Sequence, residues 1–349
     1  MSFVYNMNSI VFPAEWYPQS AIQITWPHIN TDWASILDEA IACYVNLSKE
    51  ILKTTKLLIV CPCKENVKEY FTSEEQKNLI VIEIESNDTW TRDHGAISVL
   101  INDKPAIYDF GFNAWGLKFS ANFDNQITSQ LFKKSIFKRS VTYHNKLNFI
   151  LEGGAIESDG KGTLLTTSKC LLAPNRNQPL SKEEIELYII DVFGLKRVLW
   201  LENGYLAGDD TDNHIDTLAR FCSEKTIAYI KCDDENDEND EHFFELKKME
   251  EELKSFRTIE GEPYNLIPLP MATPVYEEGN RLPATYANFL IMNSVVLIPT
   301  YSSSKDSIAK EQLQKAFPTK KVIGVDCRTL IKQHGSLHCI TMQYPDGFL

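Results

Sequence analysis

Strand-like segments recur along this 349-residue chain at a nearly constant interval, and this interval constrains the fold more than any single motif. The segments lie near Ile24, Gly95, Gly153, Asp216 and Phe289, so a new one begins roughly every 60–70 residues. Such a repeat predicts similar units arranged around one centre. Length alone favours two domains or one large α/β domain, because single cores usually stop growing at about 250–300 residues. The repeat favours one closed domain over residues 1–349, since each unit can pack on its neighbours.

Apolar, strand-like runs alternate with amphipathic helical patterns, which predicts an α/β (α+β) fold class. Strands are expected at Ala21–Trp26, Lys56–Cys61, Leu79–Ile84, Ala96–Ile101, Ala106–Phe110, Gly153–Glu157, Thr163–Thr167, Arg197–Leu201, Thr217–Cys222, Thr226–Lys231, Tyr264–Leu269, Asn293–Pro299, Lys321–Val325 and His338–Gln343. Helices are expected at Asp32–Thr54, Ser181–Phe193, Asp240–Ser255 and Ser304–Phe317. Ser181 and Glu184 have the spacing of a capping box at a helix start. The acidic run Asp233–Glu241 is interpreted as a solvated surface connection before a helix.

The charge balance narrows the class of ligand. The chain has 48 acidic and 35 basic residues and a net charge of −13, which argues against a general nucleic-acid surface. Met1–Ile10 has no signal-peptide pattern. The apolar run Phe289–Tyr301 falls short of the roughly 20 residues that a membrane span needs. We therefore expect a soluble, cytoplasmic protein that binds neither nucleic acid nor membrane.

The eight cysteines do not predict a disulfide framework in a chain of this length. Cys61 and Cys63 are separated by one residue and lack a usual zinc spacing, so no metal site is expected there. The sequence contains no glycine-rich phosphate loop and no dinucleotide fingerprint.

Five short segments concentrate the residues that carry chemistry: Thr89–Gly95, Leu151–Ile156, Gly208–Asp216, Tyr286–Asn288 and Gly335–Thr341. Together they supply Cys339 as a nucleophile, His214 as a base and several carboxylates, which is the inventory of a Cys–His hydrolase. The carboxylates Asp93, Asp210 and Asp216 would hold a cation, and a planar guanidinium matches carboxylates bidentately. A cation beside Cys339 would also favour the thiolate over the thiol.

Six motifs, in this order over most of the chain, resemble the agmatine deiminase branch of the guanidino-group-modifying enzymes, within the peptidyl-arginine deiminase superfamily. They are Phe12–His28, Asn87–Ile97, Leu151–Asn177, Asp209–Phe221, Tyr286–Pro299 and Gly335–Thr341. The resemblance implies a five-bladed α/β propeller (pentein) of ββαβ-like units around a central site. It also implies hydrolysis of agmatine to N-carbamoylputrescine and ammonia, in polyamine (putrescine) biosynthesis, without a metal or organic cofactor.

The resemblance further implies a role for seven residues. Cys339 is similar to the family nucleophile and His214 to its acid/base, while Asp93 and Asp216 are similar to the pair that holds the guanidinium. Glu152 corresponds to a carboxylate that orients the histidine, Asp210 to a substrate-binding acid and Trp90 to an aromatic that lies against the substrate.

Two further histidines adjoin these residues. His94 is expected to face away from the site. His338 is expected to be structural, because neighbours along a strand point to opposite faces.

The sequence leaves other functions open. A deiminase of peptidyl or free arginine, an amidinotransferase and a non-catalytic pentein that acts as a binding module are the alternatives. Free arginine would need a cationic partner for its α-carboxylate. The expected partner is therefore a small cationic guanidino substrate, and a homodimer is compatible with the chain.

Overall fold

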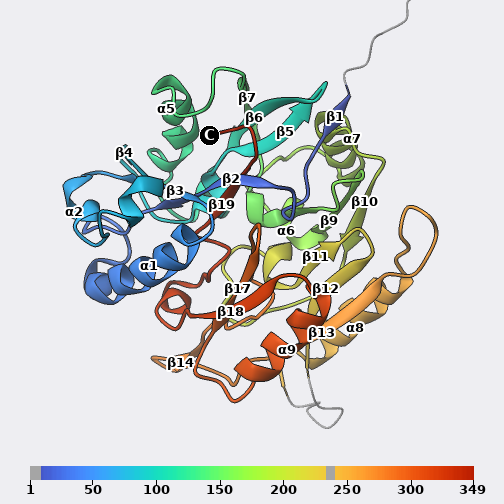
Figure 1. Ribbon diagram of the computed structural model, residues 1–349. Helices are drawn as coiled ribbons and strands as arrows, with labels where there is room; N and C mark the ends of the chain where they lie inside the picture. The colour runs from blue at the N-terminus through green and yellow to red at the C-terminus, as the bar shows by residue number, and fades with distance from the viewer. Residues whose placement is uncertain (1–8, 233–239) are drawn as a thin grey trace, which may run out of the picture.

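The protein is described by a computed structural model that covers residues 9–232 and 240–349. Within these residues the chain forms five sheets and one two-stranded hairpin (Figure 1). Every sheet contains an antiparallel pair of strands, then a helix, then a third strand that runs parallel to the second. This ββαβ arrangement, repeated five times, confirms the predicted pentein fold class.

The first sheet contains strands from both the N-terminal and the C-terminal part of the chain. It contains β19 (Met342–Pro345), β2 (Gln19–Thr25), α1 (Leu37–Leu52), β3 (Lys56–Cys61) and β4 (Leu79–Glu83). The second contains β5 (Ile97–Ile101), β6 (Lys104–Gly111), α5 (Ile127–Lys133) and β7 (Thr142–Ile150), with β1 (Ile10–Val11) added at its edge.

The other three sheets have three strands each. The third contains β8 (Ile156–Ser158), β9 (Thr163–Thr167), α7 (Lys182–Phe193) and β10 (Arg197–Leu201). The fourth contains β11 (Ala219–Ser223), β12 (Thr226–Lys231), α8 (Phe243–Ser255) and β13 (Asn265–Pro270). The fifth contains β16 (Leu290–Ile291), β17 (Val295–Thr300), α9 (Asp306–Ala316) and β18 (Lys321–Asp326). The hairpin is β14 (Tyr276–Glu277) with β15 (Asn280–Arg281).

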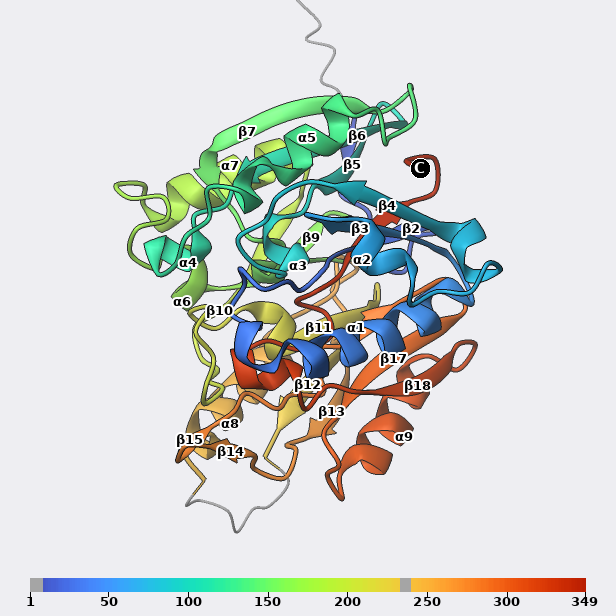
Figure 2. The same ribbon diagram turned by 90° about the vertical axis from the view of Figure 1, so that its left-hand side faces the viewer.

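The last strand closes the first sheet. β19 pairs antiparallel with β2, so Met342 lies opposite Gln23. β2 pairs parallel with β3, as expected when a helix connects two neighbouring strands. Seen from the side, α1 lies beside β18 of the fifth sheet, so the first and fifth units are neighbours in space (Figure 2).

Both faces of the first sheet are buried. In β3, Leu57 and Ile59 belong to one apolar cluster and Leu58 and Val60 to another. A continuous apolar strand is typical of a sheet covered on both sides. Tyr44 of α1 is fully buried in the first of these clusters, so the helix packs its apolar stripe against the sheet.

The predicted strands and helices occur, with revised boundaries. α1 begins at Leu37 rather than Asp32, after a 3-10 turn at Ala34–Ile36. Ser181 and Glu184 form the predicted capping box of α7. The strand predicted at His338–Gln343 is wrong in its first half, because His338–Ile340 form a turn and β19 begins at Met342. The sequence patterns did not indicate α5 and β7 at all.

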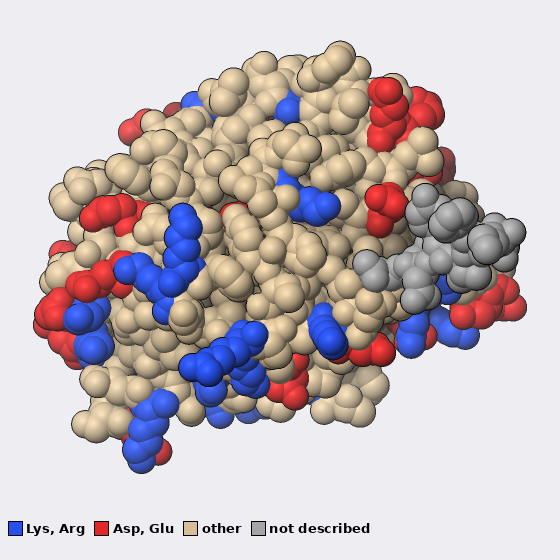
Figure 3. Space-filling view, turned by 90° about the horizontal axis from the view of Figure 1, so that it is seen from above, with Lys and Arg blue, Asp and Glu red and all other residues tan. Residues whose placement is uncertain are grey.

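Charged side chains are scattered over the surface. On the described part of the face seen from above, Lys, Arg, Asp and Glu lie singly or in small groups among uncharged residues (Figure 3). Most of the acidic run falls outside the described residues, except Asp240, which pairs with His242 and Arg281, and Glu241, which also pairs with Arg281. No helix in the described ranges combines the length and apolar character that crossing a membrane requires.

Candidate active site

The five chemical segments occupy equivalent places in the five units, each at or directly before the first strand of its sheet. Their backbone is irregular: α3 (Thr91–His94) is a single turn, and Gly153–Ala155 and Ile215–Thr217 are 3-10 turns. Because each segment belongs to a different sheet, side chains that are distant in sequence meet between the units. The residues brought into this buried cluster are Asp93, Glu152, His214, Asp216, Asn288 and Cys339.

Cys339 lies in the turn before β19 and is 6% exposed. Its backbone N–H and its thiol both point to Oδ1 of Asn288, at 3.3 and 3.4 Å. The carbonyl of Cys339 accepts a hydrogen bond of 3.0 Å from the backbone N–H of Arg92. These contacts fix the sulfur between the second, fifth and first units.

Asp93 is buried, and both of its oxygens are held. Trp115 Nε1 donates to Oδ2 at 2.9 Å and the backbone N–H of Gly154 donates to Oδ1 at 3.0 Å. Burial, with the nearby carboxylates of Asp216 and Glu152, raises the pKa of Asp93 well above its usual value. A cation bound here would offset this repulsion.

Asp216 is fully buried, and His338 Nδ1 lies 2.7 Å from its Oδ2. Burial alone would raise the pKa of Asp216, but the hydrogen bond with His338 and the charges of His338, His214 and Arg220 together outweigh it, and the pKa is lowered. Asp216 is therefore the carboxylate of the cluster that is held in the ionised form.

His214 lies between two carboxylates. Its Nδ1 is 3.6 Å from Oδ1 of Asp93, and its Nε2 is 4.0 Å from Oε2 of Glu152. Burial lowers the pKa of His214 to about 3, although Asp216 opposes this shift. Glu152 is itself clamped by Arg176, whose Nε donates to both carboxylate oxygens at 3.0 and 3.1 Å.

Two polar atoms of this cluster have no hydrogen-bond partner among the described residues, Nε2 of His214 and Oδ1 of Asp216. Both residues are at most 1% exposed. Buried polar atoms are normally hydrogen-bonded, so each such exception requires an explanation. His214 Nε2 is directed at Glu152, whereas Asp216 is close enough to Cys339 for its charge to affect the thiol, so Asp216 Oδ1 is a free acceptor for a polar ligand at the sulfur.

A narrow pocket leads to the sulfur. Its lining includes Trp90, Asp93, Asp210 and Cys339, four of the predicted site residues, together with Gly335. A Cβ on Gly335 would lie 2.0 Å from the Trp90 ring, so only glycine fits this wall. Burial and the neighbouring Asp209 raise the pKa of Asp210 to about 6.

Burial raises the pKa of the Cys339 thiol well above its usual value, and the charges of Asp216 and Asp93 add to this effect. The thiol form is therefore favoured in the free protein at neutral pH. A cation next to the sulfur would shift the balance toward the nucleophilic thiolate.

Three residues of the site could be considered as metal ligands. Glu152, Cys170 and His214 bring one candidate ligand atom each within 4.8 Å of one another. Both oxygens of Glu152 already bind Arg176, whose guanidinium supplies the positive charge at this position.

Sequence reasoning gave no role in the site to Asn288 of the cluster or to four residues that contact the cluster: Trp115, Gly154, Arg176 and His338, the last of which was expected to be structural. Asn288 could have been predicted from the sequence, because Tyr286–Asn288 was already one of the five selected segments. His94 contacts Thr25 at 3.5 Å and packs against Phe112.

Comparisons with known proteins agree over the whole chain. A family model of Porphyromonas-type peptidyl-arginine deiminases matches residues 11–345. A relative from Marinomonas sp., provisionally named agmatine deiminase, is 35% identical over 98% of this chain and 96% of its own length.

Two solved structures are closely similar. A crystal structure from Porphyromonas gingivalis, provisionally named arginine deiminase, is 52% identical, with a TM-score of 0.94 over 97% of this chain and 99% of its own. The agmatine deiminase of C. jejuni, solved as a cysteine-to-serine variant with substrate bound, is 40% identical, with a TM-score of 0.91 over 100% of both chains. The predicted superfamily and the expectation of a hydrolytic enzyme are confirmed. The chain belongs to the Porphyromonas-type peptidyl-arginine deiminase family.

Proposed function

We propose that this protein is an agmatine deiminase, which hydrolyses the guanidinium group of agmatine to N-carbamoylputrescine and ammonia, a reaction of putrescine biosynthesis. The observation that carries the proposal is the unpartnered Oδ1 of the buried Asp216, whose charge acts on the Cys339 thiol, with Nδ1 of His214 3.6 Å from Oδ1 of Asp93 in the same cluster. Asp216 Oδ1 accepts an N–H of the guanidinium, and Asp93 faces a second nitrogen. Trp90 and Asp210 line the path of the alkyl amine.

The reaction begins when the bound cation stabilises the Cys339 thiolate. The sulfur attacks the guanidinium carbon and forms a C–S bond. His214 takes up the proton that the thiol loses and gives it to the departing nitrogen, which leaves as ammonia when its C–N bond breaks. A covalent S-alkylthiouronium remains on Cys339.

Water completes the cycle. His214, now neutral, accepts a proton from a water molecule that attacks the thiouronium carbon. The C–S bond then breaks, and the ureido product leaves with the thiol restored. Glu152, held by Arg176, orients the histidine for both proton transfers.

The pocket favours agmatine over free arginine. Its described lining contains Asp93, Asp209 and Asp210 but no Lys or Arg. Agmatine is cationic at both ends, whereas free arginine carries an α-carboxylate that these side chains would repel. Free arginine remains the second candidate, because the P. gingivalis structure carries that provisional name.

The test is to incubate the purified protein with agmatine, free arginine and a blocked arginine peptide, and to measure ureido product. We expect turnover of agmatine. Turnover of either other substrate without turnover of agmatine would refute the proposal. Cys339→Ser should abolish activity and keep the fold. Cys61→Ser, which changes a buried thiol in β3, is the matched control and should remain active.

A further inference from the structure

Each ring nitrogen of His338, the residue before the nucleophile, faces a different buried carboxylate. Nδ1 lies 2.7 Å from Oδ2 of Asp216, and Nε2 lies 2.7 Å from Oε2 of Glu15. All three side chains are at least nine-tenths buried. We infer that His338, anchored by Glu15, is a positioning residue that turns Asp216 toward the substrate. This inference rests on the proposed function, because it assigns Asp216 to the guanidinium.

Asp216 depends on this one ring. Among the described residues, His338 makes the only hydrogen bond to the Asp216 carboxylate, and the other oxygen, Oδ1, has no partner. A carboxylate that is fixed through one oxygen presents the other in a defined direction. Without the ring, the side chain can rotate, and the direction of Oδ1 is lost before substrate arrives.

Glu15 is a firm anchor for the ring. Its Oε2 also accepts from Arg220 Nη2 at 2.6 Å, and its Oε1 accepts from the backbone N–H of Ile291 at 2.6 Å. Arg220 in turn binds Glu157 and stacks over Phe289, with its guanidinium carbon 4.8 Å from the ring centroid. The position of His338 is therefore set by several units of the fold.

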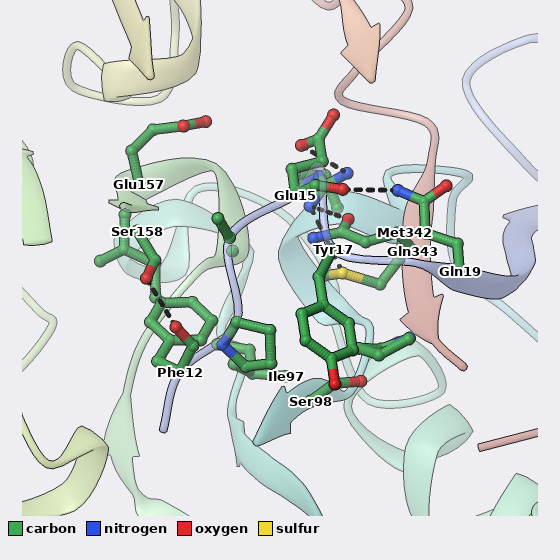
Figure 4. A pocket seen from close by; sticks show the side chains of 16 residues that line it. Phe12, Glu15, Tyr17, Gln19, Ile97, Ser98, Glu157, Ser158, Met342 and Gln343 are labelled. Carbon is green, nitrogen blue, oxygen red and sulfur yellow. Dashed lines mark hydrogen bonds and ion pairs between the residues drawn. The ribbon is translucent and has the colours of Figure 1, made fainter. Parts of the chain in front are cut away.

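A second pocket is lined by Glu15, the residue that anchors the ring. Figure 4 shows Glu15 and Glu157 on opposite sides of the pocket. Arg92 also lines it, and Arg92 Nη2 is 3.9 Å from Oε2 of Glu15. Neighbouring residues separate the two cavities: Arg92 lines this pocket and Asp93 lines the pocket that leads to the sulfur.

The imidazole is not needed to shape the nucleophile turn. The backbone N–H of His338 already donates to Oδ1 of Asn288 at 2.8 Å. The carbonyl of His338 accepts from the backbone N–H of Thr341 at 3.0 Å. These bonds survive any substitution of the side chain, so the effect of a substitution on the carboxylate can be separated from an effect on the turn.

Two amide substitutions of His338 distinguish the bond to Asp216 from the bond to Glu15. In His338→Asn, the amide nitrogen takes the place of Nδ1 and still reaches Asp216. In His338→Gln, it takes the place of Nε2 and reaches Glu15 instead. Each is made in a Cys339→Ser background, which removes the nucleophile, and agmatine binding is measured by isothermal titration calorimetry.

We expect His338→Gln to weaken agmatine binding at least roughly tenfold, because a hydrogen bond to a buried charge is lost. His338→Asn, which loses only the bond to Glu15, should weaken it about threefold, and kcat/KM should follow the same order when Cys339 is present. An equal loss in both variants, or no loss in either, would overturn the inference.

A further variant covers the case in which a His338 substitution fails to fold, as judged by circular dichroism. Glu15→Gln removes the charge that anchors the ring, and it should weaken agmatine binding about threefold or more. Unchanged affinity in a folded Glu15→Gln protein would also refute the inference. Failure of the Cys339→Ser parent to bind agmatine would instead overturn the proposed function, on which the inference depends.

Discussion

Gly154 lies at the centre of the carboxylate cluster, where a single methyl group would displace three site residues. A Cβ at this position would lie 2.5 Å from Nδ1 of His214, 2.8 Å from Oδ1 of Asp93 and 3.2 Å from Oδ2 of Asp216. Ordinary contacts begin at 3.4 Å, so the His214 ring must retreat by about 0.9 Å. The backbone N–H that holds Asp93 stays in place, which makes Gly154→Ala a purely steric test.

A displacement of about 1 Å in a catalytic group can cost roughly 100-fold in rate. We therefore expect kcat/KM for agmatine to fall about 100-fold in Gly154→Ala. The methyl group should lower the free energy of unfolding by only about 1–3 kcal/mol, which urea denaturation measures. A variant with kcat/KM within about threefold of the wild type would refute the placement of His214 and Asp93.

The matched control is Gly324→Ala in β18. A Cβ there would lie 2.8 Å from Cγ2 of Thr300, outside the site. It should cost a similar amount of stability and leave kcat/KM unchanged. A comparable loss of activity in the control would mean that packing strain, and not site geometry, sets the rate.

Three further predictions follow from the charges of the site. Asp216→Asn removes a charge that raises the pKa of Cys339, so the thiolate fraction at pH 8 should rise. The rate of iodoacetamide alkylation, followed by mass spectrometry of the Cys339 peptide, should then increase about 3–10-fold, and a slower rate would contradict this prediction. Glu152→Gln leaves the buried Arg176 cation partly unpaired, so the free energy of unfolding measured by urea denaturation should fall by about 3 kcal/mol. A change below about 1 kcal/mol would show that Arg176 does not need this carboxylate. Burial and Asp209 raise the pKa of Asp210 to about 6, so Asp210 loses its charge as pH falls through that value, and KM for agmatine should rise. In Asp210→Asn, KM should already be raised and should no longer change as pH passes through about 6.

The repeat and the apolar patterns were sufficient to predict the fold class and most strands. β3 matches its predicted bounds, because a continuous apolar run leaves little freedom in register. β9, which is short and rich in the β-branched residue threonine, matches its predicted bounds as well. β7 was missed because the centre of its sequence TYHNKLNFI, HNKLN, has few apolar residues, and most of its side chains are only half-buried or exposed. α5 is only seven residues long, too short for a clear helical period.

The site residues that were hardest to predict are those that join the site only because the fold brings them close to it. Trp115 donates to Asp93 from a backbone with φ of 55°, a left-handed conformation that non-glycine residues rarely adopt and that no propensity rule predicts for tryptophan. His338 was expected to point away from its neighbour because a strand was predicted there. The observed turn removes that alternation and directs the ring to Asp216.

The pairing of β19 with β2 has a consequence for how the enzyme is made. β19 follows all the other strands in chain order, yet it completes the first sheet, and Cys339 lies just before it. During synthesis, the second, third and fourth units are complete before α9 and β19 leave the ribosome, whereas the first unit still lacks β19. A nascent chain that ends before residue 339 lacks both Cys339, the proposed nucleophile, and the strand that closes the ring. Under the proposed function, catalysis therefore begins only after the ring has been closed.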